Sequence, residues 1–386
     1  MFGLSRMTQI VEPSSIRRMF NIAENMHDVV SFALGEPDFK TPENIVETAV
    51  KYMRQGYNKY TANAGLFALR EAVAQKQMEE QGVVYDPAKE VIITAGAMGA
   101  LSLLFMVTLD PDDEVIISNP YWTNYLQQIR MFRGIPKFVD VFEEDGFVFT
   151  GENLKNAVTG KTKAIVLNSP ANPTGGVIPL NTLKQIAKVA QEHDLLIVFD
   201  EVYKKIIYED FHQSIAKIPG MKEQTVVIDS FSKSYAMTGW RVGYAAGPEK
   251  IIAQMVKYQE NVTASVNTAA QYAAIEALSG NQDRLAMMVN TYAKRRRLAV
   301  DGIRNIEGLT CIEPKGAFYI FANIKKTGMS SEEFAMKLLQ QERVVVIPGN
   351  GFGKAGEGFV RISYATSEAM IEEGLKRIGR FLTKIR

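Results

Sequence analysis

The chain has 386 residues, of which 46% are hydrophobic, and its 44 Lys and Arg against 43 Asp and Glu give a formal net charge of +1. This balance disfavours nucleic acid as a partner, and no apolar run reaches the roughly 18 residues that a membrane span needs. One cysteine, Cys311, and three scattered histidines predict neither a disulfide nor a metal site. The first residues lack the pattern of a signal peptide, so we expect a cytoplasmic protein.

The N-terminal segment is expected to form an arm with a short helix over residues 15–24. A turn rich in Gly and Pro follows at 34–39, with the sequence LGEPDF. Its backbone is expected to be exposed and to have a defined conformation. Amphipathic helices are then predicted over residues 42–55, capped by Thr41, and 66–81.

Short apolar runs alternate with amphipathic helices from residue 91 onward. Such runs, rich in β-branched residues and joined by helices, are typical of a largely parallel sheet that is covered on both faces. The sequence therefore predicts an α/β fold. The expected strands are 91–94, 115–118, 137–141, 164–168, 195–200, 226–230 and 242–246, and the expected helices include 96–109, one from Tyr121, and 180–192.

The C-terminal part has a different order of predicted helices and strands. Helices over 249–279, with a break near 262–266, and over 283–304 lead to an α+β pattern, whose strands are expected in one smaller sheet. Those strands are 318–324, 344–347 and 359–364, with helices over 331–341 and 367–382. We predict a large domain at 41–285 and a small C-terminal domain at 286–386, which the N-terminal arm at 1–40 joins.

The stretch SFSKSYAMTGWR at 230–241 lies where a predicted strand opens into a loop. Ser230, Ser232 and Arg241 are donors suited to a phosphate. Lys233, partly desolvated and near a second cation, is expected to lose pKa and become an amine nucleophile. The pattern predicts a phosphorylated carbonyl cofactor held as a Schiff base. The alternative is a solvated loop with an incidental lysine.

Three further groups follow predicted strands, where open α/β sheets bind their ligands. The small residues Gly96-Ala97-Met98 begin a helix and leave backbone N–H groups free to bind an anion. Two prolines in the loop 168–175 present Asn172 in a fixed direction. Asp200 ends a buried strand and needs a partner to stay charged, or else caps a helix. Tyr203 follows three residues later.

Four motifs occur in a fixed order: NPTG at 172–175, DEVY at 200–203, SFSK with GWRVG at 230–243, and RIS at 361–363. Asn172, Asp200, Lys233 and Arg361 are separated by 28, 33 and 128 residues. With this set the sequence resembles the class I aminotransferases, pyridoxal-phosphate enzymes of fold type I, in their aspartate/aromatic branch. The resemblance covers nearly the whole chain.

The resemblance implies a role for each matching residue around the cofactor ring. Lys233 would bond covalently to pyridoxal 5′-phosphate and act as general base and acid. Asp200 would pair with the pyridine nitrogen and keep it protonated. Tyr203 and Asn172 would bond the ring oxygen, and Trp122 would stack on the ring.

It also implies the contacts of the phosphate and the substrate. The substrate carboxylate would bind Arg361 as a bidentate pair, helped by Gly35, Asn172 and Trp122. Tyr60 would serve the neighbouring subunit's phosphate, which requires a homodimer. The phosphate ligands would be Ser230, Ser232, Arg241 and the turn at Gly96, Ala97 and Met98.

The choice of substrate is less sharply defined. Aspartate-specific relatives carry a lysine where this chain has Met98, so Met98, Ile16, Tyr60 and Trp122 are expected to line an apolar pocket for aromatic or neutral side chains. 2-Oxoglutarate is the expected acceptor. Arg17 or Arg18 from the arm could instead supply a cation for a distal carboxylate, which would give aspartate specificity.

Different functions on the same fold stay open at this point. They are C–S lyase chemistry on the same site and a non-catalytic regulator, although no DNA-binding extension precedes residue 11. A nicotinamide dehydrogenase is disfavoured because the turn after residue 94 lacks G-x-G-x-x-G spacing.

Overall fold

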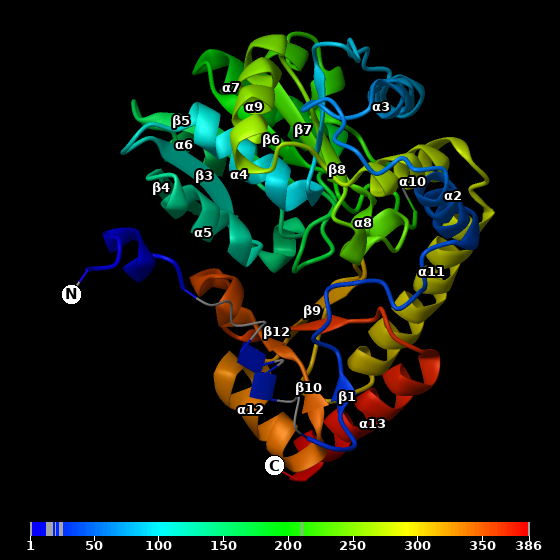
Figure 1. Ribbon diagram of the computed structural model, residues 1–386. Helices are drawn as coiled ribbons and strands as arrows, with labels where there is room; N and C mark the ends of the chain where they lie inside the picture. The colour runs from blue at the N-terminus through cyan, green and yellow to red at the C-terminus, as the bar shows by residue number, and fades with distance from the viewer. Residues whose placement is uncertain (1, 13–17, 20, 23–25, 210, 385–386) are drawn as a thin grey trace.

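The computed structural model describes residues 2–12, 18–19, 21–22, 26–209 and 211–384. The predicted helix at 15–24 falls largely outside these residues. A large sheet and two small sheets lie at opposite ends of the molecule, and α11 (Asp283–Arg304) runs from one end to the other (Figure 1). The predicted α/β fold class is confirmed, whereas the predicted domain boundaries stay a prediction.

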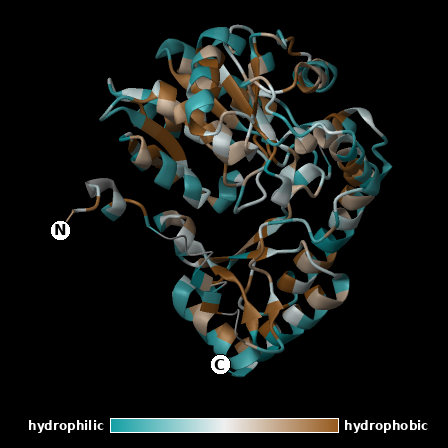
Figure 2. Ribbon diagram, in the orientation of Figure 1, coloured by the Kyte–Doolittle hydropathy of each residue, from teal (hydrophilic) through white to brown (hydrophobic). Residues whose placement is uncertain are grey.

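The large sheet has seven strands in the order β2-β8-β7-β6-β5-β3-β4. Of these, β8 runs antiparallel to its neighbours. Its central strands are buried, and they form the hydrophobic interior in Figure 2. The strands are β2 (Val91–Thr94), β3 (Glu114–Asn119), β4 (Ile135–Asp140), β5 (Thr162–Asn168), β6 (Leu196–Asp200), β7 (Thr225–Ser230) and β8 (Gly243–Ala246).

Helices cover this sheet on both sides, as a buried parallel sheet requires (Figure 1). α4 packs on β7 and β8 and contacts α9. α10 packs against α2 and α3. These helices are α2 (Glu43–Arg54), α3 (Phe67–Gln81), α4 (Gly96–Thr108), α5 (Thr123–Met131), α6 (Gly151–Ala157), α7 (Leu180–Glu192), α8 (Phe231–Ser234), α9 (Glu249–Val262) and α10 (Thr268–Ser279).

The C-terminal strands form two sheets rather than the one predicted. β11 (Ile347–Pro348), β12 (Phe359–Ser363) and β9 (Tyr319–Asn323) make an antiparallel sheet, in the order β11-β12-β9. β10 (Val344–Val345) instead pairs in parallel with β1 (Val30–Ser31) from the N-terminal segment. Helices α12 (Ser331–Glu342) and α13 (Glu368–Lys384) pack against each other beside these sheets.

Three local predictions need correction. The single strand predicted at 344–347 is divided at Val346, where the chain passes from one sheet to the other. The helix predicted from Tyr121 begins at Thr123, because Trp122 has extended backbone angles. Thr41 does not cap α2. Its hydroxyl donates to the carbonyl of Ala236 at 2.6 Å, and the position before the helix is occupied by Pro42.

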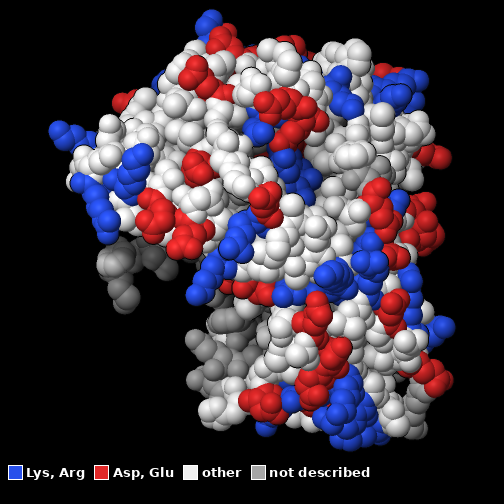
Figure 3. Space-filling view, turned by 90° about the vertical axis from the view of Figure 1, so that its right-hand side faces the viewer, with Lys and Arg blue, Asp and Glu red and all other residues white. Residues whose placement is uncertain are grey.

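The surface carries charges of both signs. In Figure 3, Lys and Arg side chains are interspersed with Asp and Glu over one face of the molecule. No helix in the described residues combines the length and the apolar character needed to cross a membrane.

Candidate active site

A cavity of about 270 Å³ lies where the carboxyl ends of the large-sheet strands face the small sheets. It contains most of the residues that the sequence motifs single out. The lining residues are Gly35, Ala97, Met98, Trp122, Tyr125, Asn168, Asn172, Asp200, Val202, Tyr203, Ser230, Ser232, Lys233, Thr238, Arg241, Tyr319 and Arg361. A more open hollow of about 1170 Å³ lies elsewhere and includes none of these residues.

Asp200 ends β6 and is buried in the cavity floor. Its Oδ2 accepts from the hydroxyl of Tyr125 at 2.5 Å, and its Oδ1 accepts from the N–H of Val202 at 3.2 Å. Burial raises the pKa of Asp200 to about 6, although both donors oppose the rise. No helix begins here, so the helix-cap alternative is wrong. Within the described residues this carboxylate has no ion-pair partner, and it therefore suits a positively charged ligand group.

Lys233 lies in α8, directly after β7. Its Nζ donates to the carbonyl of Gly35 at 2.6 Å. Burial lowers the pKa of Lys233 to about 8; Glu36 opposes this, and the guanidinium groups of Arg361 and Arg241 add to it. An amine with this pKa is partly neutral near physiological pH, which a nucleophile requires.

The opposite end of the cavity is suited to an anion. Arg241 is exposed, and its Nη1 donates to the carbonyl of Thr238 at 2.9 Å. Gly96 begins α4, and a Cβ there would lie 2.8 Å from Nη2 of Arg241. Gly96 thus makes room for the guanidinium and is not part of the cavity lining. The N-terminus of α4, with no acidic residue in its first turn, adds free N–H groups.

Arg361 lies in β12 and is 1% exposed. Its Nη1 donates to Oδ1 of Asn172 at 3.0 Å, its Nη2 donates to the carbonyl of Ala33 at 2.6 Å, and its Nε has no partner among the described residues. Burial lowers the pKa of Arg361, and the phenols of Tyr319 and Tyr203 oppose the change. In the described part of the chain no carboxylate forms an ion pair with this guanidinium, so it can receive one from a ligand.

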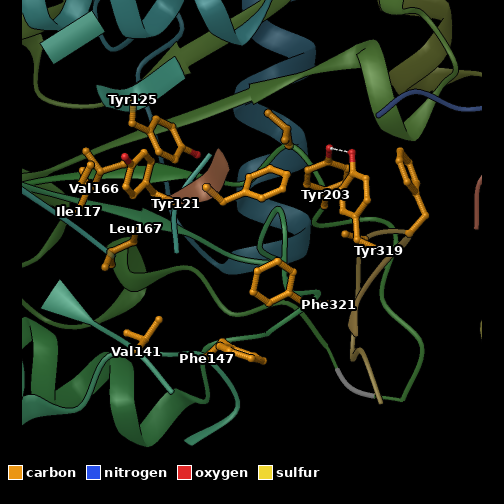
Figure 4. Packing of buried hydrophobic residues seen from close by; sticks show 14 of the residues in the cluster. Ile117, Tyr121, Tyr125, Val141, Phe147, Val166, Leu167, Tyr203, Tyr319 and Phe321 are labelled. Carbon is orange, nitrogen blue, oxygen red and sulfur yellow. Dashed lines mark hydrogen bonds between the residues drawn. The ribbon is translucent and has the colours of Figure 1, made fainter. Parts of the chain in front are cut away.

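Two tyrosines of the cavity lining contact each other. The hydroxyls of Tyr203 and Tyr319 lie 2.7 Å apart, and the dashed line in Figure 4 marks the hydrogen bond between them. Beside them Trp122 packs edge-on against Tyr125, with ring centroids 5.2 Å apart. The cavity therefore brings together four groups: the carboxylate of Asp200, the amine of Lys233, the anion-binding end at Arg241 and the buried guanidinium of Arg361.

Five lining residues have no predicted role: Tyr125, Asn168, Val202, Thr238 and Tyr319. Asn168 carries a usable sequence signal because it ends β5 as Asp200 ends β6, and the two residues pair in register. Its Oδ1 accepts from the N–H of Asn172 at 2.9 Å, which orients that loop. Tyr319 carries no such signal, since it enters from a strand of the other sheet.

Two predicted pocket residues, Tyr60 and Ile16, and the two arm arginines, Arg17 and Arg18, either lie elsewhere or fall outside the described residues. Tyr60 is 87% exposed and does not line the cavity of its own chain. Arg18 is half-exposed and forms an ion pair with Glu332 instead. Ile16 and Arg17 lie outside the described residues.

Comparison with known proteins agrees with this arrangement. Residues 27–378 match the family described as aminotransferase class I and II. The chain is 43% identical to an aspartate aminotransferase of Pyrococcus abyssi and 41% identical to aromatic-amino-acid aminotransferase 2 of Thermococcus litoralis, each over 98% of both chains. The solved structure of the aspartate aminotransferase from Thermus thermophilus with maleate superimposes with a TM-score of 0.95, at 39% identity, over 99% of this chain and 100% of that one.

A partly buried lysine of lowered pKa beside an anion-binding end suits an enzyme that anchors an aldehyde cofactor. The chain belongs to the class I and II aminotransferases. Its reaction is transamination, and its cofactor is pyridoxal 5′-phosphate. The site fits this group, because Asp200 lacks a cation among the described residues, Lys233 offers an amine and Arg241 faces a helix N-terminus.

Proposed function

We propose that the chain transfers the amino group of aromatic and other neutral L-amino acids to a 2-oxo acid such as 2-oxoglutarate. The observation that carries this proposal is that the cavity lining includes the uncharged side chains of Met98, Trp122 and Tyr125. The cationic residues of the lining are Lys233, Arg241 and Arg361, and all three have other roles in the proposal. No described cation of the lining is then left for the distal carboxylate of aspartate.

Met98 is held in this wall by weak contacts. Its Sδ lies 3.2 Å from Nδ2 of Asn124 and 3.4 Å from Nε2 of Gln128. A thioether adapts to side chains of different shape, which suits a pocket for several neutral substrates. Neither amide belongs to the cavity lining, so both act on the pocket through Met98.

Asp200 and Lys233 would carry the chemistry. When bound, pyridoxal phosphate supplies an aldehyde for the amino group and a ring that accepts electron density. Asp200 would hold a proton on the ring nitrogen, which a buried, unpaired carboxylate favours. Lys233 Nζ would remove the proton from the substrate Cα, and its lowered pKa supports this task.

The remaining lining residues would bind and orient. Arg361 would take the substrate carboxylate, with Asn172 and the backbone of Gly35 beside it. Tyr203 and Asn172 would direct donors to the ring oxygen, and Trp122 would cover the ring face. The phosphate would be held by Ser230, Ser232, Arg241 and the backbone of Ala97 and Met98, for which Gly96 leaves space.

A homodimer is the second part of the proposal. Tyr60 is exposed, although the resemblance assigns it to a phosphate, and a partner subunit would resolve this conflict. The open hollow of about 1170 Å³ has an apolar component that includes Met53, Trp240 and Met287, and it suits a protein partner. The cytoplasmic location stays a prediction.

A substrate panel tests the proposal. We expect kcat/KM for phenylalanine and tyrosine to equal or exceed that for aspartate, with alanine measured as a small neutral substrate. A hundredfold lead for aspartate, about 2.7 kcal/mol in transition-state binding, would contradict the proposed specificity. The names of the relatives do not decide this, because both aspartate and aromatic aminotransferases are among them.

A further inference from the structure

Tyr319 belongs to β9 of the small antiparallel sheet, and its side chain is fully buried. Its hydroxyl lies 2.7 Å from that of Tyr203, which follows β6 of the large sheet (Figure 4). A Cβ built at Gly35 would be 3.0 Å from the same hydroxyl. The phenol therefore sits at the junction of the N-terminal turn, the large sheet and the small sheet.

The ring of Tyr319 has a second contact. The guanidinium carbon of Arg361 lies 4.5 Å from its centroid, within the range of a cation–π interaction. Arg361 and Tyr319 lie on neighbouring strands, since β12 pairs with β9. The ring centroid of Phe352 lies 5.1 Å from the same guanidinium carbon, so the arginine is flanked by aromatic rings.

The hydrogen bond between the phenols has two possible directions, and they have different consequences. Each hydroxyl has one proton to donate. If Tyr203 donates to Tyr319, its proton is unavailable to a ligand in the cavity. If Tyr319 donates to Tyr203, the proton of Tyr203 can point into the cavity, and Tyr203 becomes a stronger donor because its oxygen accepts a bond.

We infer that Tyr319 is a positioning residue with two separable functions. Its hydroxyl donates to Tyr203 and directs the proton of Tyr203 towards the cofactor, while its ring holds the Arg361 guanidinium in place for the substrate carboxylate. This inference rests on the roles proposed above for Tyr203 and Arg361. It adds a residue that receives no role from the sequence motifs.

The chain offers a matched control in Tyr208. The hydroxyl of Tyr364 donates to that of Tyr208 at 3.1 Å, and the guanidinium carbon of Arg296 lies 4.6 Å from the centroid of the Tyr208 ring. Tyr208 thus has a phenol pair and an arginine over its ring, as Tyr319 has, yet it does not line the cavity. The Tyr208 hydroxyl also donates to the carbonyl of Ala317, so a substitution at Tyr208 removes at least as many contacts as one at Tyr319, at a position outside the cavity.

The first measurement is a pH titration of the absorbance of the bound cofactor. Donors to the ring oxygen favour its more negative, deprotonated form, so a weaker donor raises the midpoint. We expect Tyr319→Phe to raise the midpoint by about 0.4–1 pH unit, the equivalent of one hydrogen bond. Tyr203→Phe should raise it further, and Tyr208→Phe should leave it unchanged.

The second measurement is the affinity of the holoenzyme for maleate and for 3-phenylpropionate, carboxylates that carry no amino group. Tyr319→Phe keeps the ring and should bind both within about twofold of wild type. Tyr319→Leu removes the ring and should weaken both by about 3- to 30-fold, the range of one cation–π contact. Tyr208→Leu is the matched control for lost packing, and circular dichroism checks that each variant folds.

An unchanged or lowered midpoint in Tyr319→Phe would overturn the inference, because it would mean that Tyr319 accepts from Tyr203 or only packs against it. Wild-type carboxylate affinity in a folded Tyr319→Leu would overturn it as well. Reference variants separate this failure from a failure of the proposed function. If Tyr203→Phe does not shift the midpoint, or Arg361→Lys binds carboxylates normally, the proposed roles themselves are wrong.

Discussion

The hydroxyl of Tyr125 donates to Oδ2 of Asp200 over 2.5 Å, and both side chains are buried. This bond and the N–H of Val202 stabilise the charged carboxylate, yet burial still raises the pKa of Asp200 to about 6. The protein without its cofactor therefore keeps a carboxylate that is costly to ionise, at the place where the ring nitrogen is proposed to bind.

Asp200→Asn should make the apoprotein more stable and the enzyme inactive. The unfolded carboxylate ionises near pH 3.9 and the folded one near 6, so the wild type loses stability as the pH rises between these values. Above pH 6 the variant should gain as much as about 3 kcal/mol in the free energy of unfolding, and under about 1 kcal/mol at pH 4.5. Urea unfolding of the apoproteins at pH 4.5 and 7.5 measures this. A less stable variant at pH 7.5, or a fully active one, would contradict the role.

Lys233→Ala should fold but lose transamination by many orders of magnitude, because no other lysine of the described residues lines the cavity. Since burial lowers the pKa of Lys233 to about 8, the rate of covalent cofactor uptake by the apoprotein should rise with pH through a midpoint near 8. Borohydride reduction and peptide mapping should label Lys233. Lys205→Ala is the control and should keep the label, whereas a label on Lys204 or Lys205 in the wild type would refute the assignment.

The proposed dimer predicts complementation between two damaged subunits. A mixture of Tyr60→Phe and Lys233→Ala chains should form heterodimers in which one site carries both lesions and the other carries neither. Activity should therefore exceed that of either variant alone. Sedimentation that shows a fully active monomer would rule the shared site out.

A second buried charge cluster should contribute to stability. Lys204 Nζ lies 3.0 Å from both Oδ2 of Asp229 and the hydroxyl of Tyr244, and 3.9 Å from Oε2 of Glu201. Lys204→Met would leave two buried carboxylates with one cation fewer, which should cost about 3–5 kcal/mol. Adding Asp229→Asn should restore much of the loss. Thermal unfolding of the single and double variants measures both effects, and a single variant as stable as wild type would be the contrary result.

The sequence predicts best those features that adjacent residues determine. Asp200 and Lys233 follow short apolar runs that form strands, so both could be placed at strand ends. The same reasoning predicts one strand over residues 344–347, which is wrong. A continuous apolar run does not indicate that its two halves, on either side of Val346, pair with different strands.

The site shows the same limit. The sequence predicts that Gly96 contacts the cofactor, and this stays a prediction. What the sequence does not indicate is that a Cβ at Gly96 would lie 2.8 Å from Nη2 of Arg241, a residue far away in the chain. Tyr125 and Tyr319 acquire their partners only when strands and helices from separate parts of the chain meet. No local sequence pattern identifies residues such as Tyr125 and Tyr319. The spacing of the motifs does identify residues such as Asp200 and Lys233, which lie at the ends of neighbouring strands.

The bond from Arg361 Nη2 to the carbonyl of Ala33 joins residues 328 positions apart. During synthesis at about 5–20 residues per second, Ala33 is therefore made about 16–66 seconds before the arginine that it orients. β1 likewise waits for β10, so the N-terminal segment lacks this strand partner while the large sheet forms. The carboxylate site is thus completed only when the chain is almost finished, and a nascent chain is expected to contain the strand ends that carry Asp200 and Lys233 before it can bind the substrate carboxylate.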